Sequence, residues 1–225
     1  MRTACLEGVK RLGPHLHPEI TMTCSPMAPV LDDWDRGDHL KLRSFFRKEA
    51  GKLAAAGCDF FVCPDNTAHI AMEMPGGDFP LPALHIGEVL AERARSEGRR
   101  KVGILGTRFT MGGPVYPAAL GRREIGWAVP DEEDRRTVDE VIFGELCLGE
   151  SREDSRHAFV SIIARLEKEG CDAVALACTE IPLLVSAEVS PLPILDSTRL
   201  LAEAAVEAAT GARPLPAWRG GPVEA

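Results

Sequence analysis

The 225-residue sequence lacks an uninterrupted apolar stretch of 18 residues, and its first thirteen residues lack the apolar core of a secretory signal. The first absence excludes a transmembrane helix, and the second leaves no visible signal peptide. Basic residues are also in deficit, with 26 Lys and Arg against 34 Asp and Glu. Because phosphate binding needs an excess of positive charge, neither nucleic acid nor a membrane is the expected partner.

Paired cysteines are the next missing feature. The sequence has seven cysteines, an odd number, and no Cys-x-x-Cys motif. A disulfide framework is therefore not expected, and this usage is typical of a reducing cytoplasm. The histidines His15, His17 and His39 have no partners at the spacing of metal ligands, so no metal site is predicted. With 45% hydrophobic residues, the chain can still build a sizeable core.

Short apolar segments alternate with amphipathic ones along the chain. The apolar segments are continuous in character, which is typical of parallel strands covered on both faces. The amphipathic segments repeat their apolar residues with the helical period of 3.6. This alternation predicts an α/β fold with parallel sheets and right-handed crossovers. The expected strands are 19–24, 59–63, 82–86, 101–106, 125–129, 172–177 and 192–195, and helices are expected around 42–53, 138–146, 159–166 and 200–208.

An internal repeat predicts the architecture. GCDFFVCPDNT (57–67) is matched by GCDAVALACTE (170–180), and LPALHIGEVLAERA (81–94) is matched by LPILDSTRLLAEAA (192–205). Two similar α/β lobes facing each other produce such a repeat, and ligands of such folds bind where the strands end. We expect a first lobe of residues 1–86 plus 199–225 and a second lobe of residues 87–198.

One strand of this repeat has no partner. The expected strand 101–106 would find its counterpart 113 residues earlier, which falls before Met1. Either the first lobe lacks its opening strand or the chain starts late, and a start site chosen too far downstream is the favoured explanation. Loss of that strand leaves an exposed sheet edge in the first lobe.

Polar residues follow the paired strands at equivalent positions. In the repeat, Asp65 aligns with Cys178, and each lies where a strand gives way to a helix. The free N–H groups of a helix start favour a carboxylate and lower the pKa of a thiol, although Asn and Thr there can equally serve as helix caps. Two acid/base groups on opposite sides of a carbon are what stereoinversion requires. The remaining aligned pairs are Asn66 with Thr179 and Thr67 with Glu180.

Several motifs resemble those of the aspartate/glutamate racemase family. ACTEIPLL (177–184) resembles the family's GCTE motif, and DNTAH (65–69) resembles its CNTAH motif. LGTRFTM (105–111) and IFGELCLGE (142–150) resemble the bacterial amino-acid racemase branch. The resemblance covers residues 5–210. It implies two pseudo-symmetric lobes, a homodimer, and a racemase of aspartate, glutamate or a similar amino acid that uses two bases and no pyridoxal phosphate or other cofactor.

The family's functional residues transfer to this chain with one departure. Cys178 matches the second catalytic cysteine, but Asp65 stands where the first cysteine is expected, and Cys63 is an alternative for that role. The residues that match substrate contacts are Asn66, Thr67, Thr179 and Thr107. The departure keeps two alternatives open. One is a decarboxylase or cis-trans isomerase of the same fold, and the other is an inactive protein that binds a carboxylate.

Overall fold

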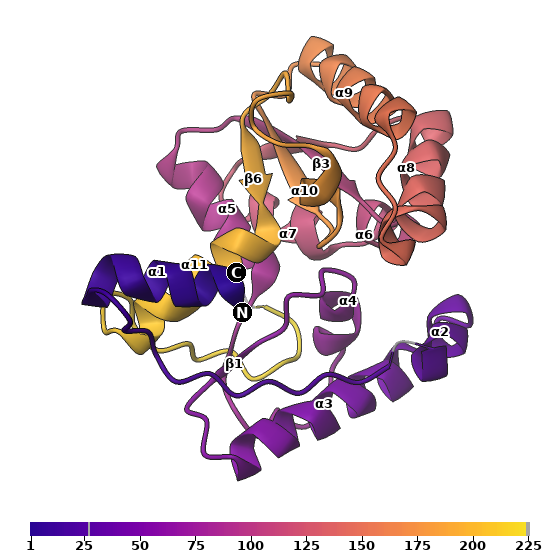
Figure 1. Cartoon of the computed structure of the whole chain (residues 1–225). Helices are drawn as coiled ribbons and strands as arrows, with labels where there is room; N and C mark the ends of the chain where they lie inside the picture. The colour runs from indigo at the N-terminus through magenta and orange to yellow at the C-terminus, as the bar shows by residue number, and fades with distance from the viewer. Residues whose placement is uncertain (27, 224–225) are drawn as a thin grey trace. The chain divides into compact units, whose positions relative to one another are not determined.

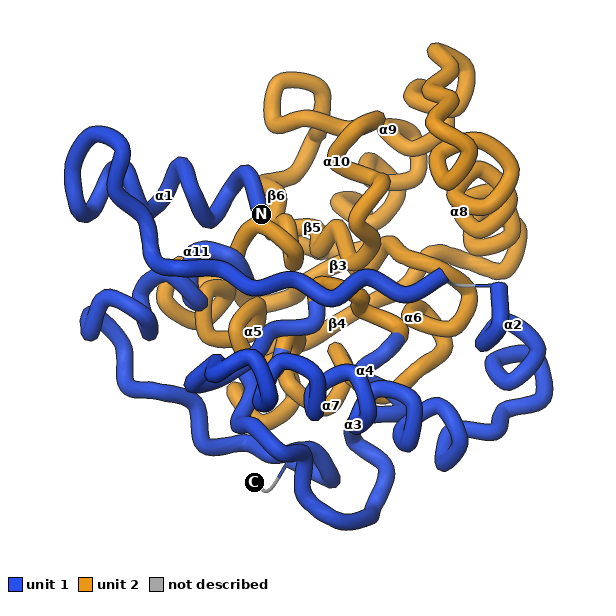
Figure 2. The backbone as a smooth tube through the Cα atoms, turned by 60° about the horizontal axis from the view of Figure 1, so that its bottom comes forward, with its two compact units in different colours: residues 1–63, 68–85, 201–225 blue, residues 64–67, 86–200 orange. Residues whose placement is uncertain are grey.

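A computed structural model describes residues 1–26 and 28–223 of the chain. The chain divides into two compact units, coloured separately in Figure 2. Unit 1 comprises residues 1–63, 68–85 and 201–225, and unit 2 comprises residues 64–67 and 86–200. In the described part of the chain, no helix is long and apolar enough to cross a membrane.

Unit 2 is built on a four-stranded parallel sheet. Its strands are β3 (Lys101–Gly106), β4 (Gly126–Ala128), β5 (Ala173–Ala177) and β6 (Ile194–Asp196), in the order β4-β3-β5-β6. The central strand β5 is buried along its whole length, and β3 is buried from its second residue onward. Their continuous apolar sequence is therefore explained by cover on both faces. The predicted α/β class with parallel sheets is confirmed.

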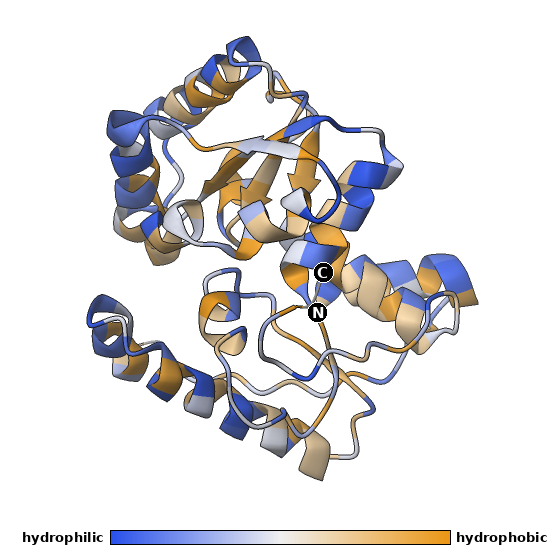
Figure 3. Cartoon of the chain, turned by 180° about the vertical axis from the view of Figure 1, so that it is seen from behind, coloured by the Kyte–Doolittle hydropathy of each residue, from blue (hydrophilic) through white to orange (hydrophobic). Residues whose placement is uncertain are grey.

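Helices cover both faces of this sheet (Figure 1). On one face lie α8 (Glu132–Gly144) and α9 (Glu153–Lys168), and on the other α5 (Ile86–Ser96) packs against α7 (Val115–Gly121). Both α8 and α9 carry hydrophilic and hydrophobic sides (Figure 3). Short helical segments follow the strands or join the long helices: α6 (Arg108–Gly112), the 3-10 helix η1 (Leu146–Leu148) and α10 (Ile181–Leu184).

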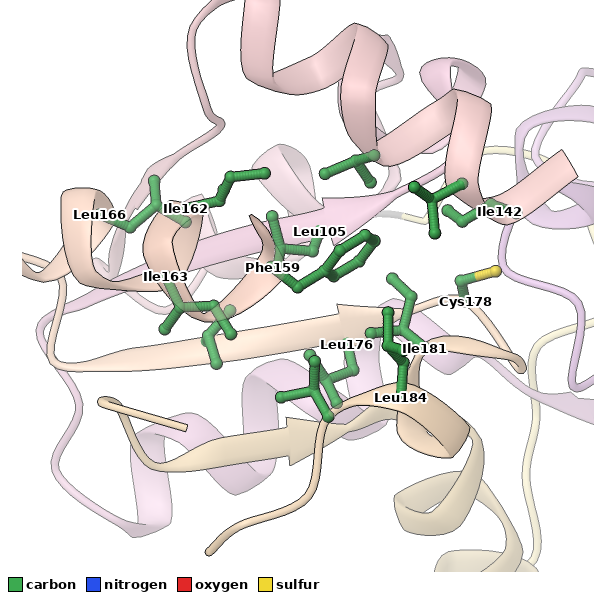
Figure 4. Packing of buried hydrophobic residues seen from close by; sticks show 14 of the residues in the cluster. Leu105, Ile142, Phe159, Ile162, Ile163, Leu166, Leu176, Cys178, Ile181 and Leu184 are labelled. Atoms are coloured by element: carbon green, nitrogen blue, oxygen red, sulfur yellow. The ribbon is translucent and has the colours of Figure 1, made fainter. Parts of the chain in front are cut away.

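The core of unit 2 lies between its sheet and the pair α8 and α9 (Figure 4). Phe159, Ile162 and Leu166 of α9 point into it and are at most 1% exposed. Burying each such side chain contributes about 1.5–3 kcal/mol. Gly103 in β3 lets α9 approach closely, because a Cβ there would lie 2.8 Å from the Leu166 side chain. The same cluster extends to Cys178, just beyond β5.

Unit 1 has a smaller sheet with the same kind of pairing. Its two parallel strands are β1 (Phe61–Val62) and β2 (Ala83–Leu84), which are shorter than predicted. The core includes Phe61, Met72 and Phe79, and Cys63 packs against it. The helices of this unit are α1 (Arg2–Leu12), α2 (Ala28–Asp35), α3 (His39–Ala55), α4 (Ala68–Met72) and, from Leu201 onward, α11 (Ser197–Ala209).

The prediction of a strand at residues 19–24 is wrong. This segment has no ladder partner, and Ile20 and Met22 are 39% and 69% exposed. A side-chain hydrogen bond joins this segment to α3: the Thr23 hydroxyl donates to the Glu49 carboxylate at 2.6 Å. Alternating apolar residues predict a strand only when a neighbouring strand supplies hydrogen bonds and one face is covered. Neither condition holds here.

The sequence repeat is reproduced in the strand register. Phe61 pairs with Ala83 in unit 1, and the equivalent residues Val174 and Ile194 pair in unit 2. The helices before β1 and β5 also end in the same way. Each is followed by a glycine in the left-handed conformation, Gly57 at a φ of 84° and Gly170 at a φ of 90°. Strand β5 has β3 on its other side, whereas β1 has no second strand beside it among the described residues. The pattern agrees with a first lobe that lacks the counterpart of β3.

Candidate functional site

The candidate residues of unit 2 gather at the carboxyl ends of its parallel strands. Gly106 of β3 and Ala177 of β5 are partners in register, so Thr107 and Cys178 follow at neighbouring strand ends. Residues 64–67 belong to this unit although they follow β1 of unit 1. The same edge of an open parallel sheet is where α/β proteins bind ligands.

Cys178 is a buried thiol with a charged partner. It is 6% exposed, and its Sγ donates to Oε2 of Glu180 at 3.0 Å. Its sulfur points away from the hydrophobic cluster that the side chain borders (Figure 4). Burial, together with the Glu180 carboxylate, raises the pKa of Cys178 far above its ordinary value. The free protein therefore holds a protonated thiol at neutral pH.

The expected lowering of the Cys178 pKa is thus wrong. The prediction relied on the N-terminus of the following helix, but α10 has only four residues. Desolvation of the thiolate outweighs such a weak dipole, and the neighbouring anion acts in the same direction as desolvation. As a result, Cys178 is a proton donor in its resting state.

Three threonine hydroxyls form a closed triangle beside this strand end. Thr67 Oγ1 lies 3.1 Å from Thr107 Oγ1 and 3.0 Å from Thr110 Oγ1, and the last two are 3.2 Å apart. Thr107 also caps α6 by accepting from the Thr110 backbone N–H. Gly106 lets the end of β3 lie close to the end of β5, because a Cβ there would lie 2.7 Å from the Ala177 carbonyl oxygen. The triangle holds the turn 64–67 against the end of β3.

Asn66 is held by a second buried contact. The side chain is 4% exposed, and Tyr116 of α7, which is fully buried, donates its hydroxyl to Asn66 Oδ1. Burial raises the pKa of Tyr116 far above its ordinary value, so the phenol keeps its proton. The fully buried Ser197 hydroxyl donates to the Leu176 carbonyl at 2.9 Å.

The remaining predicted residues are distributed differently. Asp65 and Thr179 are both exposed. Asp65 immediately precedes the buried Asn66, and Thr179 immediately follows the buried Cys178. Cys63 is half-buried and packs against the core of unit 1. The structure therefore places Thr67 in contact with Thr107 in unit 2, which also contains Asn66 and Cys178, while it packs Cys63 against the core of unit 1.

Thr110, Tyr116 and the role of Glu180 are not among the residues predicted for the site. Two of them carried a signal. Tyr116 is the chain's single tyrosine, and Thr110 lies one helical turn after Thr107. Glu180 was aligned with Thr67, but its contact with Cys178 depends on how the turn after β5 closes. Across residues 1–26 and 28–223, no group of three or more His, Cys, Asp or Glu side chains is arranged to hold a metal ion.

Comparisons with known proteins agree with one another. The family model described as Asp/Glu/Hydantoin racemase matches residues 1–205. Over 169 residues the chain is 24% identical to the broad specificity amino-acid racemase RacX of Bacillus subtilis, which covers 75% of this chain and 73% of that protein.

Solved structures give the same result. A putative Asp/Glu racemase from Yersinia pestis superposes with a TM-score of 0.81 at 31% identity, covering 93% of this chain and 91% of that chain. An aspartate racemase homologue from Pyrococcus horikoshii superposes with a TM-score of 0.74 at 22% identity over the same shares of the two chains.

Proposed function

The chain belongs to the Asp/Glu/Hydantoin racemase family, and we propose that it is a cofactor-independent racemase of aspartate, glutamate or a similar amino acid. Members of this family are isomerases, so the proposal concerns the substrate and the residues that move the proton. The observation that carries it is the buried thiol of Cys178, which donates to the Glu180 carboxylate just beyond the carboxyl end of β5.

The reaction needs one group that removes the α-proton and another that returns a proton to the opposite face. In our proposal the Asp65 carboxylate takes the α-proton of one enantiomer, and the Cys178 thiol donates its own proton to the resulting carbanion. The products of this step are the other enantiomer, a protonated Asp65 and a Cys178 thiolate. Reversal begins from that enzyme form, and proton exchange with water resets it.

Glu180 gives Cys178 its second role. A thiol with a raised pKa is a poor base, because the proton must leave before the sulfur can accept another. Glu180 Oε2 already accepts the thiol hydrogen at 3.0 Å and is therefore placed to take that proton. We assign Glu180 as the positioning residue through which Cys178 changes between its acid and base forms.

The substrate carboxylate needs hydrogen-bond donors. The amide nitrogen of Asn66 and the hydroxyls of Thr67, Thr107 and Thr179 supply them in this proposal. In the closed triangle each hydroxyl can donate only one proton, so a ring in which each donates to the next has none to spare. For Thr67 or Thr107 to donate to an anion, at least one hydroxyl must therefore turn its proton from the triangle to the ligand.

Exchange in D₂O tests the proposal. The protein is incubated separately with L- and D-aspartate and L- and D-glutamate, and the α-proton and the enantiomer are followed by NMR and chiral chromatography. We expect loss of the α-proton signal together with inversion for at least one pair. Cys178→Ser should reduce inversion by at least about 100-fold, within the range for loss of an acid/base group.

The matched control is Cys24→Ser, which alters an exposed cysteine of unit 1 and should leave inversion unchanged. Absence of exchange with all four amino acids would contradict the proposal. Inversion at the wild-type rate in Cys178→Ser would remove this thiol from the mechanism.

One alternative is favoured by a specific observation. Cys63 packs against the core of unit 1, so Cys178 is the thiol at the proposed site, and Asp65 replaces the other family cysteine. A single thiol suits a decarboxylase or a cis-trans isomerase as well as a racemase. Carbon dioxide release from a malonate-type acid, or isomerisation of an alkene diacid, without α-proton exchange would support that alternative. A protein that binds these acids and converts none of them would be a binding protein.

A further inference from the structure

Tyr116 is a fully buried polar side chain that reaches a proposed substrate-binding residue from outside the predicted motifs. It lies in α7, is 0% exposed, and donates its hydroxyl to Asn66 Oδ1. A phenylalanine would fill nearly the same volume. The hydroxyl is therefore the part of Tyr116 that needs an explanation beyond packing.

The hydrogen bond fixes the direction of the Asn66 amide. An asparagine side chain has one oxygen that only accepts and one nitrogen that only donates. Because the Tyr116 proton holds the oxygen, the amide nitrogen is turned to the other side. A reversed amide would leave the buried Tyr116 proton without the acceptor it has here, and would present its oxygen to the ligand, where it would repel a carboxylate.

The bond joins two segments of unit 2 that are distant in sequence. Asn66 reaches unit 2 in the short segment 64–67, and Tyr116 lies in α7, fifty residues further along the chain. The bond therefore holds the amide of that segment against α7.

We propose that Tyr116 is a positioning residue that holds the Asn66 amide with its nitrogen directed to the substrate carboxylate. The inference rests on the proposed function, since it assigns Asn66 to carboxylate binding. It also implies that Asn66 acts as a donor alone, so the ligand atom it meets is a hydrogen-bond acceptor such as a carboxylate oxygen.

A double-mutant cycle tests the inference. The variants are Tyr116→Phe, Asn66→Ala and the two combined, measured for KM, kcat and the Kd of succinate by calorimetry. We expect Tyr116→Phe to raise KM and Kd about tenfold and to lower kcat less. The double variant should bind no more weakly than Asn66→Ala, because Tyr116 has nothing to hold once the amide is gone. A purely structural role for the hydroxyl would give additive losses instead.

Ser155→Ala is the matched control, because Ser155 is also a buried hydroxyl of unit 2 and donates to Glu145 at 2.7 Å outside the site. It should leave KM and Kd unchanged. Thermal melting shows whether Tyr116→Phe folds. If that variant fails to fold, Asn66→Asp, which keeps an oxygen for the Tyr116 proton but replaces the donor nitrogen with a second oxygen, should raise the Kd of succinate at least about tenfold, and wild-type affinity in Asn66→Asp would overturn the inference.

The binding measurement separates this inference from the proposed function. Weaker succinate binding in Tyr116→Phe, with no turnover by the wild type, would support the inference and contradict the racemase proposal. Wild-type affinity in Tyr116→Phe beside a weakened Asn66→Ala would overturn the inference while leaving the racemase proposal intact. A wild-type protein that binds neither succinate nor the four amino acids would contradict both.

Discussion

The two copies of the internal repeat share a backbone pattern and differ in the chemistry that follows it. Phe61 pairs with Ala83 as Val174 pairs with Ile194, so the strand register is common to both units. After the strands, one copy carries an exposed Asp65 and the other a buried Cys178. Register depends on backbone hydrogen bonds and apolar cover, which tolerate a change of the residue beyond the strand. The comparison teaches that the fold constrains where the two groups stand and leaves their identity open.

The two sheets also differ in the number of strands and contacts that hold the residue after the strand. Cys178 follows the central strand β5, which β3 and β6 flank, and it belongs to a large hydrophobic cluster. Asp65 follows the two-residue strand β1, and its segment is held by the threonine triangle and by the Asn66–Tyr116 bond. Burial raises the pKa of the thiol, whereas the carboxylate is exposed to water. We infer that this contrast makes Cys178 the resting acid and Asp65 the resting base.

The largest expected effect comes from removing the acid/base group that we propose for the first copy, and the matched comparison replaces that group with a second thiol. Asp65→Cys restores two thiols and should retain inversion within about tenfold of the wild type, whereas Asp65→Asn removes the base and should lower kcat/KM by about 10²–10⁴-fold. Chiral chromatography of both reaction directions measures the two variants. Since enantiomers have equal free energy, kcat/KM must be equal in the two directions, and any asymmetry falls on kcat and KM separately. Full activity in Asp65→Asn would exclude Asp65 as the base.

The next effect comes from removing the charge beside the thiol. Glu180→Gln should lower the pKa of Cys178, because the neighbouring anion that opposes the thiolate is gone. It should also lower kcat by about 10–100-fold, since the acceptor of the thiol proton is lost. Thiolate absorbance at 240 nm, taken as the difference from the same protein with Cys178→Ser, follows the titration.

Glu188→Gln, which changes an exposed carboxylate after α10, serves as the control and should change neither quantity. An unchanged thiol titration in Glu180→Gln would show that burial alone raises the pKa of Cys178.

Burial of the thiol also predicts a loss of stability at alkaline pH. The folded-state pKa of Cys178 is raised, while a thiol in the unfolded chain titrates near 8.5. Above that pH the unfolded chain binds fewer protons than the native protein, so the free energy of unfolding falls as pH rises. The contribution of this group is about 2 kcal/mol between pH 8 and pH 10. Urea unfolding of wild type and Cys178→Ser at both pH values should show it as a difference that the variant lacks.

The smallest expected effect concerns the other cysteine of the first copy. Cys63→Ala removes a half-buried side chain from the edge of the unit 1 core and should cost about 1 kcal/mol of stability. Inversion should remain at the wild-type rate, since we assign no proton transfer to Cys63. Urea unfolding and chiral chromatography measure the two quantities, and a large loss of inversion with little loss of stability would reassign the first acid/base group to Cys63.

Much of the fold follows from the periodicity of the apolar residues. The segments that this periodicity mispredicts are those whose structure depends on distant parts of the chain. Strand 101–106 is predicted with its observed limits, because the continuous apolar run after Lys101 is typical of a buried strand. Residues 19–24 alternate apolar and polar residues, but the neighbour that would turn them into a strand is absent from the described structure. The division proposed from the repeat, residues 1–86 plus 199–225 and residues 87–198, stays a prediction.

Prediction of the site is likewise limited where a property depends on contacts that local sequence does not determine. Motif and repeat located Cys178, Thr107 and Asn66 near strand ends, since position relative to a strand is a local property. The pKa direction of Cys178 was mispredicted, because it depends on burial and on a carboxylate that a turn brings to the sulfur. Tyr116 was missed because its partner Asn66 lies fifty residues away in sequence.

The most direct test of the central claim compares α-proton exchange in Cys178→Ser and Asp65→Asn. Each variant is incubated in D₂O with each enantiomer of the preferred substrate, and recovered substrate is analysed by NMR for α-deuterium. If the two side chains act on opposite faces, each variant loses inversion but still exchanges one enantiomer, and the two variants exchange opposite ones. Exchange of the same enantiomer by both variants, or of neither enantiomer by both, would contradict the assignment of Cys178 and Asp65 as the two proton-transfer groups.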